Sequence, residues 1–175
     1  MTAVHEEIVE TAPLPPLVLH WAEEQACAHF AQRLAALPEV RGAFIALSGG
    51  LGVGKTTFAR CLLRALGVAG AIKSPSYTIV EGYAAPGELP IAHFDFYRFD
   101  DEREWEDAGL RDAFAAAGLK LAEWPEHAAG LLPAADLTLH IALDGEAAGA
   151  RRATLTARSP LGRRILRALR EEEHA

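Results

Sequence analysis

The stretch Gly49-Gly50-Leu51-Gly52-Val53-Gly54-Lys55-Thr56 decides the fold of this chain. The apolar run at 43–47 precedes it and is typical of a buried strand. Residues 57–66 follow it, and their apolar side chains recur at helical spacing. A strand, a glycine-rich turn, a Lys-Thr pair and a helix, in this order, form a cradle for phosphate groups. The stretch therefore predicts that the chain binds a nucleoside triphosphate.

Each residue type in the stretch has a physical role. Glycines let several backbone N–H groups surround one anion, and the helix N-terminus adds about half a positive charge there. Lys55 is expected to reach the β- and γ-phosphates, and the Thr56 hydroxyl to be a ligand of Mg²⁺. The alternative is a plain glycine-rich turn with an incidental lysine. The expected nucleotide contacts here are Gly49, Gly52, Val53, Gly54, Lys55, Thr56 and Thr57.

Length and composition indicate one acidic globular domain. The chain has 175 residues, of which 50% are apolar, and a formal net charge of −7. Such a charge argues against unaided binding of nucleic acid, which needs clustered Lys and Arg. Cys27 and Cys61 suggest neither a disulfide framework nor a metal cluster. We find no signal-peptide pattern and no apolar run of membrane-spanning length, so the expected location is the cytoplasm, without membrane contact.

The domain is expected to span residues 17–175, after a flexible, proline-containing lead-in at 1–16. Its last helix carries an apolar stripe and a serine at the N-cap position. The expected elements outside the phosphate cradle are a strand at 17–19, a helix at 21–37, two closing, antiparallel strands at 137–143 and 153–157, and a last helix capped by Ser159.

Two apolar strands end in a carboxylate. The strand at 91–95 ends at Asp95, and the strand at 119–123 ends at Glu123. In a parallel sheet the C-terminal ends of the strands face the ligand crevice, so both acids are candidates for holding Mg²⁺ or orienting the attacking water. Of the two, Glu123 is favoured as the metal ligand and Asp95 as the water-positioning group. A solvated strand end is the alternative for either acid.

A hydroxyl-rich loop lies between the phosphate-binding helix and the first of these strands. It begins near Lys73, and a strand is expected at 77–83. P-loop proteins often keep a nucleotide-sensing switch at this place, although a plain surface loop is the alternative. Further on, the charged turn at 101–107 reads as a solvated face, in which Trp105 either packs inward or contacts a partner.

The C-terminal end is locally basic. From Arg151 onward it carries seven of the seventeen Lys and Arg residues of the chain. Opposite charges on one small domain orient it on a partner and speed their encounter. We therefore expect either a docking surface, for a protein or a nucleic acid, or a solvated amphipathic helix, and Arg151 or Arg152 is a candidate for a position near the nucleotide.

Three further blocks accompany the glycine stretch. They are Ser74-Pro75-Ser76-Tyr77-Thr78, His93-Phe94-Asp95-Phe96-Tyr97-Arg98 and Glu123-Trp124-Pro125-Glu126. Together they resemble the TsaE (YjeE) family of small bacterial ATPases, which are needed for threonylcarbamoyladenosine modification of tRNAs that read ANN codons. The resemblance runs from about residue 21 to about residue 157.

The resemblance implies an α/β, P-loop NTPase-like three-layer sandwich with a mixed, mainly parallel sheet. It implies ATP and Mg²⁺ as cofactors and TsaD and TsaB as partners, with tRNA reached only through their complex. Ser74 to Thr78 would form the switch-like loop, and Trp124 the rim of the site. The residues that it assigns to catalysis are Lys55, Asp95 and Glu123, those to the metal Thr56, Glu123 and Asp95, and those to the nucleotide outside the glycine stretch Ser74, Thr78 and Trp124.

The departures from the family pattern are small. Ser76 stands in place of a usual threonine and keeps its hydroxyl, Phe96 replaces a leucine, and Gly82 replaces a proline. None of them removes a group that carries chemistry.

Other functions share the same phosphate cradle. A small-molecule kinase normally needs an arginine-bearing lid, but no arginine lies between Arg111 and Arg151. A GTPase is disfavoured because the Asn-Lys-x-Asp signature is absent. A nucleotide-gated scaffold with incidental turnover is the non-enzymatic alternative.

Overall fold

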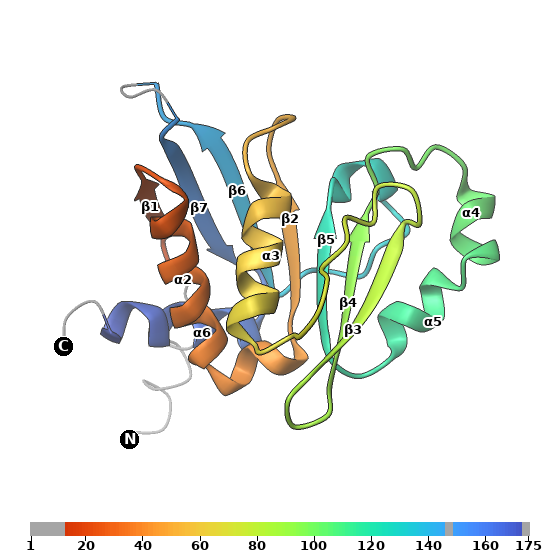
Figure 1. Ribbon diagram of the computed structural model, residues 1–175, viewed down its shortest axis with the longest axis horizontal. Helices are drawn as coiled ribbons and strands as arrows, with labels where there is room; N and C mark the ends of the chain where they lie inside the picture. The colour runs from red at the N-terminus through yellow and green to blue at the C-terminus, as the bar shows by residue number, and fades with distance from the viewer. Residues whose placement is uncertain (1–12, 146–148, 173–175) are drawn as a thin grey trace, which may run out of the picture.

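A seven-stranded sheet with helices on both faces forms the body of the protein (Figure 1). The computed structural model describes residues 13–145 and 149–172, so most of the lead-in expected at 1–16 lies outside it. The strands are β1 (Leu17–Trp21), β2 (Phe44–Ser48), β3 (Val80–Ala85), β4 (Leu89–Asp95), β5 (Leu119–Glu123), β6 (Leu137–Leu143) and β7 (Arg151–Ala157). The helices are α2 (Glu24–Ala36), α3 (Lys55–Ala65), α4 (Glu102–Asp107), α5 (Leu110–Ala115) and α6 (Pro160–Glu172), with 3-10 turns η1 (Pro38–Gly42) and η2 (Pro125–Ala128).

The sheet is mixed, with the strand order β1-β7-β6-β2-β5-β4-β3. The four central strands β6, β2, β5 and β4 are parallel to one another. The edge strands β1 and β3, and β7 between β1 and β6, are joined to the sheet by antiparallel pairings. The expected α/β architecture is confirmed, and its parallel part is the centre of the sheet, where the glycine-rich turn follows β2.

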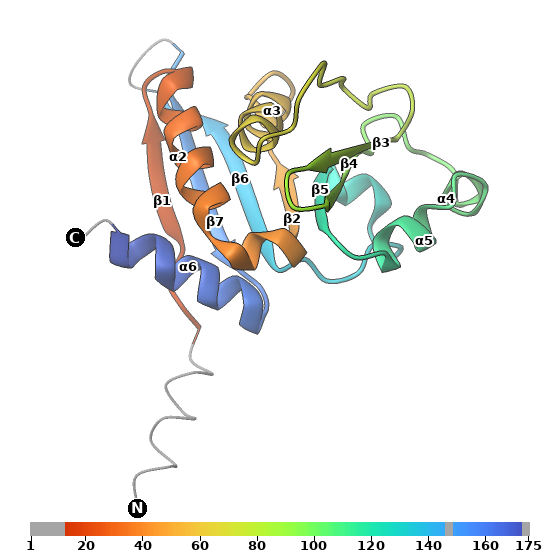
Figure 2. The same cartoon turned by 60° about the horizontal axis from the view of Figure 1, so that its bottom comes forward.

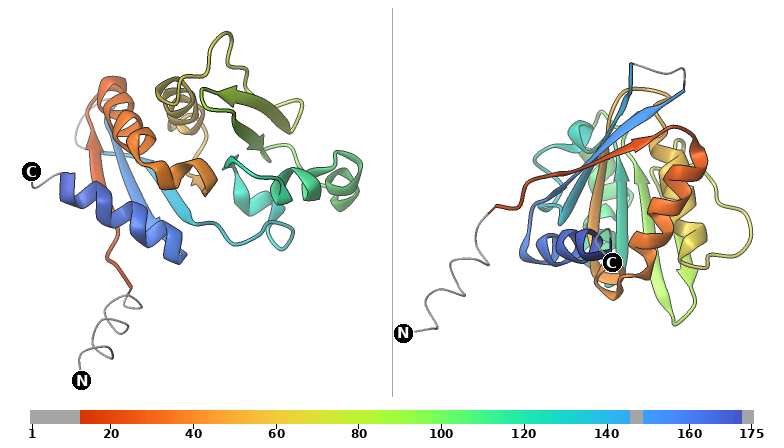
Figure 3. Two further views of the ribbon diagram at one scale, coloured as in Figure 1. Left: turned by 90° about the horizontal axis from the view of Figure 1, so that it is seen from below. Right: turned by 90° about the vertical axis from the view of Figure 1, so that its left-hand side faces the viewer.

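Alternation along the strands divides the core into two layers. Ile45 and Leu47 on β2 belong to the cluster under α2 and α3, whereas Phe44 and Ala46 belong to the cluster under α4 and α5. Figures 2 and 3 show α2 and α3 together on one side of the sheet, away from α4 and α5. Trp105 is buried in the second cluster, so it packs inward.

Several boundaries differ from the sequence-based expectation, among them the start of β4, which is Leu89 instead of residue 91. Trp21 ends β1 instead of opening a helix, and its indole packs 5.9 Å from Phe30 and 6.1 Å from Phe58, between ring centroids. The strand expected from residue 77 starts at Val80, because Ile79 has a left-handed backbone and its N–H closes a turn onto Pro75. Strand β7 starts two residues earlier than expected, at Arg151.

The two cysteines, distant in sequence, meet between α2 and α3. Cys27 is buried and Cys61 is half-buried, and both are free thiols. Burial, aided by the neighbouring Cys61, raises the pKa of Cys27 to about 12, so this thiol stays protonated at neutral pH.

Helix α6 is anchored at its first turn. The Ser159 hydroxyl accepts a hydrogen bond from the Gly162 N–H at 3.0 Å, which confirms the expected cap, and it donates to Asp136. The other carboxylate oxygen of Asp136 accepts the Phe44 N–H at 2.8 Å, at the start of β2. Asp136 therefore joins α6 to the strand that leads into the glycine-rich turn.

This anchor predicts an unusual response to alanine. A Cβ atom at Gly162 would overlap the main-chain carbonyl group of Asp136, whereas one at Gly42 would meet nothing within 4 Å. Gly162→Ala should lower the free energy of unfolding by about 1–3 kcal/mol, although alanine normally favours a helix. Chemical denaturation of both variants checks this. A Gly162→Ala protein at least as stable as Gly42→Ala would contradict the close packing of α6 on Asp136.

Candidate functional site

The turn after β2 has the backbone of a phosphate cradle. Gly49, Gly52 and Gly54 have positive φ angles of 136°, 73° and 112°, a region that other residues rarely adopt. At Gly49 a side chain would also overlap the carbonyl group of Ile141 on β6. Helix α3 begins immediately after this turn, at Lys55. The glycines are therefore required by the conformation, and the turn presents its backbone at the N-terminus of a helix.

The Lys55 ammonium is held by its own loop. Its Nζ atom donates to the carbonyl oxygens of Gly49 at 2.8 Å and Gly50 at 2.7 Å, and lies 3.9 Å from the ring centroid of Trp124. Only 4% of the residue is exposed. Burial lowers the pKa of Lys55, and the nearby carboxylates, Glu123 first among them, partly offset this effect. The ammonium thus lies at the mouth of the loop between an aromatic face and acidic groups.

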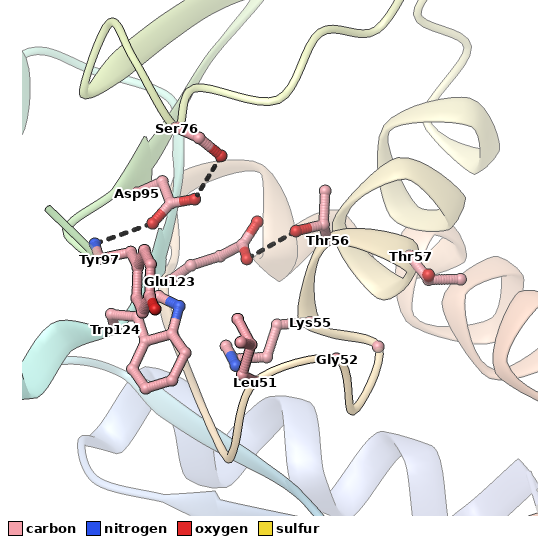
Figure 4. Close-up of a pocket in the computed structure, with 11 residues that line it drawn as sticks. Leu51, Gly52, Lys55, Thr56, Thr57, Ser76, Asp95, Tyr97, Glu123 and Trp124 are labelled. Atoms are coloured by element: carbon pink, nitrogen blue, oxygen red, sulfur yellow. Dashed lines mark hydrogen bonds between the residues drawn. The ribbon is translucent and has the colours of Figure 1, made fainter. Parts of the chain in front are cut away.

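The two strand-end acids lie side by side, as expected. Asp95 on β4 and Glu123 on β5 are direct partners in the parallel ladder. The Thr56 hydroxyl donates to Glu123 Oε2 at 2.8 Å, which connects α3 to β5 (Figure 4). Asp95 accepts one hydrogen bond from the Ser76 hydroxyl at 3.2 Å and another from the Tyr97 N–H at 2.9 Å.

These groups surround one cavity of about 240 Å³. Figure 4 shows Asp95, Glu123 and Thr56 along one side of it and Trp124 and Lys55 along another. The cavity brings together residues from the turn after β2, from α3, from the loop after α3 and from the ends of β4 and β5. Its lining residues are Leu51, Gly52, Gly54, Lys55, Thr56, Thr57, Ser76, Asp95, Tyr97, Glu123 and Trp124.

The switch-like loop reaches this cavity through Ser76. Ser74 lies behind it, where its hydroxyl is 2.7 Å from that of Ser76. Thr78 turns to the following strand and donates to Glu81 at 2.9 Å. The structure thus places Ser74 and Thr78 outside the cavity lining and brings in Ser76 and Tyr97, which the sequence-based set of ligands lacked. Ser76 lies in the block at 74–78 and Tyr97 in the block at 93–98. Their places in these two blocks were the signal in the sequence that could have identified them as site residues.

A second cavity, of about 190 Å³, adjoins the other side of the same loop. It shares Gly52, Val53, Gly54 and Thr57 with the loop and adds residues from the β1–α2 connection and from β7. Arg151 on β7 donates through Nε to the Val53 carbonyl oxygen at 2.7 Å. From the sequence, Arg151 was only one of two candidates, with Arg152, for a position near the nucleotide. The sequence did not decide between them, because this contact joins residues 98 positions apart in the chain.

Other arginines of the basic C-terminal end make intramolecular contacts. Arg152 pairs with Asp144 at 3.0 Å. Arg158 donates to the Thr138 hydroxyl at 3.3 Å, and Arg170 donates to the carbonyl oxygen of Pro15. A docking role for this end remains a prediction.

Fold and loop together define an α/β protein of the P-loop NTPase-like class. The profile of one family, described as "Threonylcarbamoyl adenosine biosynthesis protein TsaE", matches residues 21–153. The chain belongs to the TsaE family.

Curated relatives and a solved structure agree with this assignment. The Haemophilus influenzae "tRNA threonylcarbamoyladenosine biosynthesis protein TsaE" is 40% identical over 139 residues, which cover 79% of this chain and 85% of that protein. The Bacillus subtilis protein of the same name is 38% identical over 105 residues, or 60% and 65% of the two chains. The crystal structure of YdiB from Bacillus subtilis superposes with a TM-score of 0.74 at 26% identity, over 93% of this chain and 99% of that one.

The described residues contain neither a membrane-spanning helix nor a metal-binding cluster of side chains. No helix among them is both long and apolar enough to span a lipid bilayer. No group of three or more His, Cys, Asp and Glu side chains within these ranges has the arrangement of a metal site.

The Arg151 contact predicts a local effect on the loop. Arg151→Gln should speed hydrogen exchange in peptides covering residues 49–57 by about tenfold or more, because hydrogen bonds to charged groups contribute about 1.5–3 kcal/mol. Arg152→Gln, which changes the neighbouring arginine, is the matched control. Equal exchange in the two variants, measured by mass spectrometry, would show that Arg151 does not stabilise the loop.

Proposed function

We propose that this protein binds ATP with Mg²⁺ and hydrolyses it in support of threonylcarbamoyladenosine modification of tRNA. One observation carries the proposal: the cradle lysine, the Thr56 hydroxyl and two carboxylates converge on a single cavity at the N-terminus of α3. The relatives above bear the name of tRNA threonylcarbamoyladenosine biosynthesis proteins. A small-molecule kinase is not favoured by this family membership.

The loop and α3 are suited to hold the triphosphate. Backbone N–H groups of the turn and the positive end of the α3 dipole attract phosphate oxygens. The Lys55 ammonium lies at the mouth of the loop, where it donates hydrogen bonds to two backbone carbonyl oxygens. A short movement of its side chain would replace these acceptors with phosphate oxygens. We assign Gly52, Gly54 and Thr57 to the same phosphates, since they line the cavity.

The donors present fit Mg²⁺. This ion is usually bound through one or two carboxylates together with nucleotide phosphates and water, not by a dedicated protein cage. The Thr56 hydroxyl and the Glu123 carboxylate are in contact, and Asp95 is the ladder partner of Glu123. We assign Thr56 and Glu123 to the ion, with Asp95 beside them. When bound, Mg²⁺ supplies neutralisation of the charge that develops on the phosphates.

Asp95 is suited to orient the attacking water. Its carboxylate lines the cavity, and bonds from Ser76 and from the Tyr97 N–H fix its direction. Trp124 and Tyr97, whose ring centroids are 5.0 Å apart, form a wall that limits access of bulk water. Hydrolysis then depends on water held by Asp95 and on a phosphoryl group held by Lys55.

The second cavity is suited to the nucleoside. It continues from Gly52 and Gly54, on the side of the loop away from the acids. Its lining includes Trp21 and Cys27, the acidic Glu23 and Glu24, and Arg151, so an aromatic ring, carboxylates and a guanidinium group lie around it. We assign the base and ribose to this space.

Hydrolysis by the isolated protein is expected to be slow. No arginine lines the phosphate cavity in the described residues, so no cation beyond Lys55 is in place to meet the developing charge. Arg98 instead stacks 4.6 Å from the ring centroid of Tyr77. We propose that the TsaD and TsaB partners of the family complete the site, and that tRNA is reached through their complex, since the net charge of −7 does not favour direct binding.

Removing the cradle lysine or the adjacent hydroxyl tests the proposal. Lys55→Ala and Thr56→Ala should each lower ATP turnover by about 100-fold or more, because each removes a group that acts on the phosphates or the ion. The readouts are phosphate release and tRNA modification, the latter reconstituted from purified components with the wild-type protein, with each variant and without this protein.

The matched control is Arg60→Ala, an exposed change one turn further along α3. Turnover within about twofold of wild type in a folded Lys55→Ala protein would remove the loop from the mechanism. Full modification with a non-hydrolysable ATP analogue would instead favour a nucleotide-gated scaffold.

The contacts of the two acids predict different kinetic defects. Glu123→Gln should raise the Mg²⁺ concentration needed for nucleotide binding by about 10–100-fold, because Glu123 is bonded to Thr56. Asp95→Asn should leave that concentration unchanged and lower the turnover number by about 10²–10⁴-fold. Titration of Mg²⁺ against nucleotide affinity and single-turnover hydrolysis separate the two, and the opposite pattern would exchange the roles.

A further inference from the structure

His93 is a buried polar residue beneath the carboxylates. It lies on β4, two residues before Asp95, and is 0% exposed. Its Nε2 atom is 2.8 Å from Glu123 Oε1. Its other ring nitrogen, Nδ1, is buried without a hydrogen-bond partner among the described residues. An apolar side chain would fill this position without an unpaired atom, so the imidazole has to be explained by its contact with Glu123.

The contact gives Glu123 a second point of attachment. Thr56 on α3 holds Oε2, and His93 on β4 holds Oε1. The carboxylate of Glu123, a residue only 2% exposed, is therefore hydrogen-bonded at both oxygens by residues of two different elements. A glutamate side chain has three rotatable bonds. Two hydrogen bonds, one to each oxygen, together fix both the position and the plane of its carboxylate.

The hydrogen-bond chemistry assigns the ring proton. A carboxylate only accepts hydrogen bonds, so Nε2 must carry the hydrogen toward Glu123. The other ring nitrogen, Nδ1, has no partner among the described residues, so the bond to Glu123 is the one hydrogen bond that the ring makes there. The imidazole ring therefore donates a hydrogen bond to Glu123 through Nε2–H.

We propose that His93 is a positioning residue for Glu123, which holds the carboxylate in place for Mg²⁺ independently of Thr56. The inference rests on the proposed function, because it concerns the ion that this function requires. Residues that hydrogen-bond a metal ligand typically change metal affinity by about 10–100-fold when they are removed. His93 is fully buried and is not among the residues that line the cavity, so it acts through Glu123.

Three variants separate positioning from packing. His93→Leu keeps a similar volume and removes the donor, whereas His93→Gln keeps an N–H donor at a similar reach. Leu121→Val is the matched control, since Leu121 is the buried, apolar ladder partner of His93. The probe is a fluorescent, non-hydrolysable ATP analogue, titrated with Mg²⁺ and separately in EDTA, together with a melting curve for each variant.

We expect His93→Leu to raise the Mg²⁺ midpoint about 10–100-fold and His93→Gln to return it to within about threefold of wild type. Leu121→Val should lower the melting temperature alone, and all variants should bind the analogue equally in EDTA. Equal Mg²⁺ midpoints in wild type and His93→Leu would overturn the proposal, and equal losses in the Leu and Gln variants would make His93 structural. If wild type shows no Mg²⁺-dependent binding, the proposed function fails instead.

A measurement on the wild-type protein covers the case in which His93→Leu does not fold. Long-range ¹H–¹⁵N NMR of the histidine rings should show His93 with hydrogen on Nε2, and Glu123→Gln should shift that resonance. A hydrogen on Nδ1 alone would overturn the inference, whatever the outcome of the titrations.

Discussion

The parallel pairing of β2, β5 and β4 is the constraint on which the rest of the structure depends. Because the three strands run in one direction, their C-terminal ends lie at the same edge of the sheet. The glycine-rich turn leaves β2 there, and Glu123 and Asp95 end the next two strands. The Thr56–Glu123 hydrogen bond then closes this edge by joining α3 to β5. If β4 or β5 ran the opposite way, Asp95 or Glu123 would lie at the far edge of the sheet, away from Thr56 and Lys55.

The peripheral elements maintain that edge. Asp136 links α6 to the first residue of β2, and Arg151 of β7 supports the glycine-rich turn at Val53. Trp124 has a left-handed backbone directly after β5, and its N–H bonds to the Leu47 carbonyl oxygen of β2. A non-glycine residue in this region is costly and is found where the surroundings require it. Here it directs the indole ring to the Lys55 ammonium.

Carboxylates and polar groups are buried at this site at an energetic cost. Lys55, His93, Asp95 and Glu123 are all buried, whereas most of the surrounding core is apolar. Burial of such groups is favourable only when they are bonded to one another or to backbone, as these four are. The site is thus assembled before any ligand arrives, and this preorganisation supports its proposed role in phosphoryl transfer.

Sequence alone determined the glycine-rich turn and the two strand-end acids, because each depends on local spacing between neighbouring residues, and the resemblance to the TsaE family implied the α/β class. The starting residues predicted for β3 and for the first helix were wrong. The left-handed backbone of Ile79 and the packing of Trp21 between aromatic rings depend on contacts with distant residues. The hydrogen bonds of His93 to Glu123 and of Arg151 to Val53, and the entry of Ser76 into the cavity, were decided only by the tertiary structure. Each joins segments whose distance in space is set by the order of the strands in the sheet, which no local pattern encodes.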